Sequence, residues 1–203
     1  MSEIKVNNIQ SLSGTNGPVI SGTVEMNSSG AMSLPRGDTA YRGGRGRGVF
    51  GGGNTAPANI NTIQYITIAT TGNARDFGDL TDARRGIAVC SSSTRGLWGG
   101  GIGSPAAVNT IDYVTISSTG NAFDFGDMTV ARRQNAGCSS SIRGLFAGNF
   151  PTASDIIDFI TIATLANAAD FGNLTVAKKA PSACSSSIRG IFGGGQAPAN
   201  SNI

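Results

Sequence analysis

Short runs of β-branched residues, separated by glycine clusters, recur along most of this chain. The clearest runs are TIQYITIAT at 62–70, TIDYVTISS at 110–118 and IIDFITIAT at 156–164. Such residues favour β-strands, and turn-forming residues bound each run. Apolar side chains occupy odd and even positions alike, as Ile63, Tyr65, Ile66 and Ile68 show. Both faces of these strands should therefore be buried, which predicts an all-β protein built of stacked antiparallel sheets.

The predicted strands belong to a repeat of about 48 residues. Four arginines mark it, because Arg47, Arg95, Arg143 and Arg189 stand 48, 48 and 46 residues apart. This period is typical of propeller-like arrays. Each repeat predicts four strands, which we name A to D. Strand A carries Cys-Ser-Ser-Ser, strand B begins at the repeat arginine, strand C is the β-branched run, and strand D carries Asp-Phe-Gly.

A basic pair closes each repeat, as Arg84-Arg85, Arg132-Arg133 and Lys178-Lys179. The A and B strands are expected four times, with a degenerate first copy after LPRG at 34–37. The C and D strands are expected three times. A tight hairpin of Ser, Thr, Arg and Gly should join A to B. The thirty glycines fit tight turns and close approach of sheets.

The order of strand, glycine pair, β-branched strand with tyrosine, aromatic segment and later arginine resembles the kelch repeat of β-propellers over residues 34–195. The resemblance implies about 3.5 kelch-like blades. The aromatic pairs, such as Tyr65 and Phe77, stand 12 residues apart, farther than in most kelch blades. Because propellers have about four to eight blades, three completions stay open: strands from KVNNIQ at 5–10 and PVISGTVEM at 18–26, an assembly of several chains, or a longer array.

The charge pattern does not favour nucleic acid as a partner. The net charge is +3, and 13% of the residues are charged, which is low for a protein that must neutralise many phosphates. Arg42, Arg45 and Arg47 form the one basic cluster, and we interpret it as a glycine-rich turn in which Arg47 fills the repeat position. No apolar run is long enough for a transmembrane helix, and the N-terminus lacks the apolar core of a signal peptide.

The residues that usually carry catalysis or bind metals are scarce. The chain has no histidine, and its only glutamates, Glu3 and Glu25, lie outside the repeats. We therefore expect no enzyme activity, no cofactor and no metal site. Cys90, Cys138 and Cys184 each precede Ser-Ser-Ser, so we expect small buried residues at equivalent positions and no disulfide framework or zinc cluster.

The Asp-Phe-Gly triplets at 76–78, 124–126 and 170–172 match the magnesium-binding triplet of protein kinases. Here the lysine strand and the catalytic loop of kinases are missing, so we interpret each triplet as a strand ending in a glycine turn with an anchoring aromatic. The carboxylate pairs of DFGD at 76–79 and 124–127 do not amount to the oxygen cage of a calcium site.

The N-terminal sequences SEIKVNNIQSLSGTNGPVISG at 2–22 and LPRGDTAYRG at 34–43 resemble the N-termini of tail-fibre and related virion proteins of tailed phages, especially marine ones. The resemblance implies a virion structural protein made in the host cytoplasm: a tail-fibre or baseplate component, or a capsid decoration. Residues 1–35 would dock on the particle or supply ring-closing strands, and residues 36–203 would form the propeller-like repeat domain.

The expected partners are other virion proteins, further copies of the chain in a homo-oligomer, and a glycan or receptor on the host surface. Neither nucleic acid nor membrane insertion is expected. An intracellular kelch-type interaction module and a carbohydrate-binding propeller remain alternatives. The loops between B and C, at 54–61, 102–109 and 149–155, differ most between repeats, which suits recognition. The candidate contact residues are Asn54, Thr55, Pro57, Asn59, Ser104, Pro105, Asn109, Phe150, Pro151 and Ser154.

Overall fold

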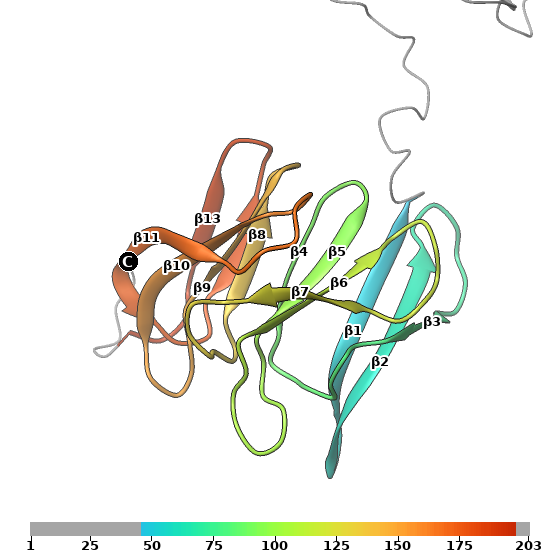
Figure 1. Ribbon diagram of the computed structural model, residues 1–203, viewed down its shortest axis with the longest axis horizontal. Helices are drawn as coiled ribbons and strands as arrows, with labels where there is room; N and C mark the ends of the chain where they lie inside the picture. Colours follow the sequence, from blue (N-terminus) through green and yellow to red (C-terminus); the bar gives the residue numbers. More distant parts are fainter. Residues whose placement is uncertain (1–45, 198–203) are drawn as a thin grey trace, which may run out of the picture. The chain divides into compact units, whose positions relative to one another are not determined.

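The structure, a computed structural model, describes residues 46–197, and these are all-β (Figure 1). They contain no helix, and their thirteen strands form four antiparallel sheets. The predicted all-β class is therefore confirmed. None of the four sheets closes on itself. No helix among these residues is long and apolar enough to cross a membrane.

Within each sheet, strands that follow one another in the chain pair as neighbours. The first sheet consists of β1 (Arg47–Thr55), β2 (Ala58–Thr67) and β3 (Arg75–Asp79). The second consists of β4 (Ala88–Ser91), β5 (Arg95–Gly99), β6 (Thr110–Thr115) and β7 (Phe123–Asp127). The third consists of β8 (Ala136–Ser139), β9 (Arg143–Ala147), β10 (Ser154–Thr161) and β11 (Ala169–Lys178). The fourth consists of β12 (Ser182–Ser185) and β13 (Gly190–Gly193).

The second and third sheets contain the four strands that the repeat predicted. The first sheet supplies strands B, C and D, and the fourth supplies A and B. The expected first copy of strand A, the segments 5–10 and 18–26, and the N-terminal segment 1–35 lie outside the described residues. One expectation is wrong: β1 and β2 continue through 54–61, so the first B–C connection is only the turn at Ala56 and Pro57.

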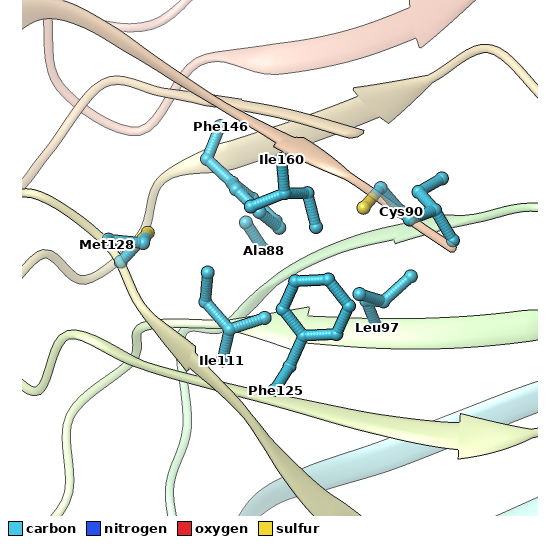
Figure 2. Packing of buried hydrophobic residues seen from close by; sticks show 9 residues of the cluster. Ala88, Cys90, Leu97, Ile111, Phe125, Met128, Phe146 and Ile160 are labelled. Atoms are coloured by element: carbon cyan, nitrogen blue, oxygen red, sulfur yellow. The ribbon is translucent and has the colours of Figure 1, made fainter. Parts of the chain in front are cut away.

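The core lies between successive sheets. Ile63, Phe77 and Leu80 of the first repeat pack against Trp98, Val114 and Ala122 of the second. Figure 2 shows the corresponding cluster between the second and third sheets, in which Leu97, Ile111 and Phe125 point toward Phe146 and Ile160. These two clusters follow from strands that are apolar on both faces.

The glycine clusters let the sheets approach closely. A Cβ atom on Gly51 would meet the Trp98 ring at 2.9 Å, and one on Gly99 would meet the Phe146 ring at the same distance. In β1 and β5 the aromatic residue is therefore followed by a glycine that admits the aromatic of the next sheet. The expectation that glycine permits close sheet approach is confirmed at these positions.

The expected burial on both faces is wrong for the first sheet, whose outward face is exposed. Ile68 is exposed, whereas Ile116 and Ile162 at the same repeat position are buried. Phe50 is likewise 60% exposed, while its counterparts Trp98 and Phe146 are 2% and 0% exposed. The outward face of the first sheet has no other described sheet against it, which accounts for the difference.

Each Asp-Phe-Gly segment forms a bulged strand. In the first sheet, Ile63 pairs with Gly78 and Gln64 pairs with Asp76, which leaves Phe77 as the extra residue. Gly78 has φ +145°, a conformation that favours glycine. The interpretation as a strand with a glycine and an anchoring aromatic is confirmed for Phe77 and Phe125, which are buried. It is wrong for Phe171, which is exposed because the fourth sheet lacks strands C and D among the described residues.

The serines of the repeated phrase have two distinct roles. Ser139 Oγ donates to Ser91 O at 2.7 Å, and Ser185 Oγ donates to Ser139 O at the same distance, so the first serine ties neighbouring first strands together. The second serine closes the A–B hairpin, because Ser92 Oγ accepts a hydrogen bond from Arg95 N at 3.1 Å. The predicted tight hairpins are confirmed in the three described copies.

Candidate functional site

Three B–C connections, together with the strand ends beside them, form the candidate contact surface, which we call the loop rim (residues 54–59, 102–109 and 149–154). They follow β1, β5 and β9, which hold the same position in successive stacked sheets. The connections consequently lie at the same end of the sheets, toward the bottom of Figure 1. Each tip carries a cis peptide bond before proline, at Pro57, Pro105 and Pro151.

The structure places all ten predicted contact residues on or beside this rim. Six are exposed: Asn54, Thr55, Pro57, Ser104, Pro105 and Pro151. Four are half-buried: Asn59, Asn109, Phe150 and Ser154. None of the ten is ionisable, so the rim offers amide and hydroxyl hydrogen bonds and small apolar contacts. Such groups suit recognition of a surface, and they neither gain nor lose a proton near neutral pH.

Hydrogen bonds hold the first two connections together. Asn59 Nδ2 donates to Ile102 O at 3.0 Å and to Gly103 O at 3.1 Å. The guanidinium of Arg85 donates to Asn59 Oδ1, and the Arg85 backbone forms a bridge with Ile102. The Asn59 side chain is thus fixed between two repeats.

Arg133 holds the third connection. Its Nε donates to Phe150 O at 3.1 Å, its guanidinium lies 5.4 Å from the centre of the Phe150 ring, and its backbone N donates to Asn149 Oδ1 at 3.2 Å. Sequence reasoning did not assign Arg85 and Arg133 to the site. The available signal was their recurrence as the second member of each basic pair.

The first member of each basic pair lies in the interior. Arg84 forms an ion pair with Asp112 at 2.9 Å, and both side chains are fully buried. Asp112 also accepts hydrogen bonds from Thr81 N at 3.0 Å and Thr81 Oγ1 at 2.7 Å. Arg132, Asp158 and Thr129 repeat this arrangement one repeat later. These pairs join the linker between two sheets to the third strand of the following sheet.

The arginine that marks the repeat also links sheets. Arg47 lies 4.7 Å from the centre of the Tyr65 ring and donates to Ile116 O in the next repeat at 2.8 Å. Arg95 makes the same contacts with Tyr113 and Ile162 O. The interpretation of Arg47 as a repeat position is confirmed, whereas Arg42 and Arg45 lie outside the described residues.

A groove lies at the end of the sheets opposite the loop rim and has a cavity volume of about 360 Å³. It was not predicted from the sequence. The first strands line it, including the cysteine and first serine of each copy: Cys90, Ser91, Cys138, Ser139, Cys184 and Ser185. Within residues 46–197, no three His, Cys, Asp or Glu side chains gather closely enough to hold a metal ion.

The three cysteines are free thiols. Burial raises the pKa of Cys90, with a smaller contribution from the neighbouring Cys138, and burial likewise raises the pKa of Cys138, with a contribution from Cys184. The expected burial is confirmed for these two cysteines. It is wrong for Cys184, which is exposed on the two-stranded fourth sheet.

Only Cys184 is expected to react rapidly with a thiol reagent in the native protein, because the thiolate is the reactive form and the other two thiols are buried with raised pKa values. Titration with a chromogenic disulfide at mildly alkaline pH should show one fast thiol, and all three after denaturation. Cys184→Ser should remove the fast phase. A fast phase that survives this substitution would contradict the assignment.

No protein-family model matches the chain, and no curated protein matches it.

Proposed function

We propose that this chain is a structural protein of a phage virion, acting through protein contacts in a tail fibre, baseplate or capsid decoration. The single observation that carries the proposal is the loop rim: uncharged, proline-tipped connections from three successive sheets, fixed by Asn59, Arg85 and Arg133. A stiff repeated scaffold that presents variable loops suits recognition. The N-terminal resemblance to tail-fibre proteins supports the virion as the location.

In this proposal the sheets are blades of a kelch-like propeller. The supporting features are four-stranded antiparallel sheets packed face to face in chain order, with first strands β4, β8 and β12 hydrogen-bonded side by side through serines. Propellers arrange their blades around a central channel. The groove lined by the first strands would then face that channel, and the loop rim would form one end of the propeller.

The proposal predicts that the protein is present in purified phage particles. Particles of a phage that encodes this sequence should yield its peptides by mass spectrometry, and antibodies raised against residues 46–197 should label a fixed position by electron microscopy. Labelling should disappear when the antibody is first saturated with the pure chain. Its consistent absence from intact particles, with the chain found only in infected-cell lysate, would favour the intracellular interaction module.

A further inference from the structure

The outer edge of β13 differs from the edges of its counterparts. β5 pairs with β6, and β9 pairs with β10, through five residue pairs in each case. β13 holds the same repeat position but pairs only with β12 among the described residues. No residue of 46–197 pairs with its other edge, whose backbone groups can therefore extend the sheet. Ile191 on this strand is 60% exposed, whereas Leu97 at the equivalent position in β5 is 1% exposed.

The contacts between the first three sheets show what packs against the equivalent positions there. The turn between strands C and D of the second repeat covers β3, because Gly120 N donates to Phe77 O at 2.7 Å and Ala122 N donates to Asp79 O at 2.8 Å. Asn121 Oδ1 accepts a hydrogen bond from Asp79 N at 3.1 Å. A turn of one sheet thus caps the outer strand of the preceding sheet.

The same arrangement recurs between the next two sheets. Ala168 N donates to Asp127 O at 2.7 Å, and Asn167 Oδ1 accepts from Asp127 N at 3.0 Å. Phe77 and Phe125 are buried beneath these turns, whereas Phe171 on β11 is 51% exposed. A cavity of about 200 Å³ lies beside it, lined by residues that include Leu145, Phe171, Ile188 and Gly190.

We infer that the edge of β13 and the face around Phe171 bind a β-hairpin of the type formed by strands C and D of this repeat. The first strand of the hairpin pairs with β13, its β-branched side chains cover Phe171, and its Asn-Ala turn hydrogen-bonds to the backbone of β11. Backbone pairing supplies affinity, and alternate side chains supply specificity, as in other cases of strand addition. The inference rests on the repeat contacts and holds whether or not the protein belongs to a virion.

The test is binding of a synthetic peptide to the full chain. A fluorescent peptide with the sequence of residues 108–129, VNTIDYVTISSTGNAFDFGDMT, should bind saturably by fluorescence anisotropy. It should also slow hydrogen exchange at 190–193 and 170–173. The matched control peptide carries Val114→Pro, which removes a backbone donor from the strand and should bind at least about tenfold more weakly.

A pair of protein variants tests the location. Phe171→Asp should weaken peptide binding at least about tenfold, whereas Phe50→Asp, at an exposed position on the first sheet, should leave it unchanged. Equal binding of both peptides, or equal affinity in both variants, would overturn the proposal. Protection, in the chain alone and with no peptide bound, of the β13 amides that do not hydrogen-bond to β12 would also overturn it. That protection would identify a second copy if it rises with concentration, and the chain's own residues if it does not.

Discussion

Replacing Phe146 with alanine is expected to lower the free energy of unfolding by about 3–5 kcal/mol, the usual range for removing a buried aromatic ring. Phe146 has no exposed surface, lies against Gly99, and packs between the second and third sheets with Leu97, Ile111 and Ile160. Its loss would leave a cavity at the centre of that interface. The measurement is urea denaturation followed by the fluorescence of Trp98, the only tryptophan in the chain and itself buried.

The matched control is Phe50→Ala, which removes the same ring from the same repeat position. Phe50 is 60% exposed, so its loss should change the free energy of unfolding by no more than about 0.5–1 kcal/mol. The difference between the variants then measures what a second packed sheet contributes at this position. Equal losses would show that the outward face of the first sheet is covered in solution, and would contradict the exposure described above.

The strand pattern and the period could be predicted because they depend on local sequence. β-branched runs, glycine clusters and the arginine spacing gave the four strands of the repeat and the tight A–B hairpins. The glycines after Phe50 and Trp98 also had a visible reason, since a side chain there would meet the ring of the next sheet. These are features that each repeat specifies by itself.

Burial at the ends of the array could not be predicted from the repeat. Phe77, Phe125 and Phe171 occupy equivalent positions, yet the first two are buried and the third is exposed. The same holds for Cys90, Cys138 and Cys184. Burial of each member depends on whether a strand of the next sheet covers it, and the residue itself does not encode that neighbour.

The geometry of the candidate site could be predicted only in part, and its role in binding stays a prediction. Variation between repeats pointed to the tips of the loop rim, whereas the arginines that fix it sit in the linkers and are distant in sequence from the loops. Arg85 contacts Asn59 from 26 residues away, and Arg133 contacts Phe150 from 17 residues away. The sequence does not distinguish the two adjacent arginines of a pair. One forms a buried ion pair, and the other binds a loop.

The sequence around Asp112 could have predicted the buried ion pair, but this signal was not used. It is a charged residue within an otherwise apolar strand, and such a residue requires a buried partner. Asp158 repeats it, but Gln64 takes its place in the first repeat, where the side chain is exposed. The position is therefore acidic only where a preceding described sheet and its linker arginine cover it.

Asp112→Ala is expected to lower the free energy of unfolding by about 3–5 kcal/mol, because it leaves the buried guanidinium of Arg84 without its ion-pair partner. Arg84 Nε and NH1 have no hydrogen-bond partner among the described residues. The Asp112 carboxylate is therefore the main group that offsets the cost of burying the Arg84 charge. Thr81 would lose two hydrogen bonds as well. Denaturation followed by Trp98 fluorescence gives the value, and Gln64→Ala, at the same repeat position but exposed, should change it by no more than about 0.5 kcal/mol.

A double variant separates the charge from the packing. Replacing both partners, Arg84→Met with Asp112→Leu, removes the unpaired charge while keeping apolar volume, so it should recover most of the stability lost in Asp112→Ala. Recovery would mean that the unpaired buried guanidinium causes most of the stability loss in Asp112→Ala. A double variant no more stable than Asp112→Ala would instead show that the Thr81 hydrogen bonds, and not the desolvated guanidinium, account for the loss.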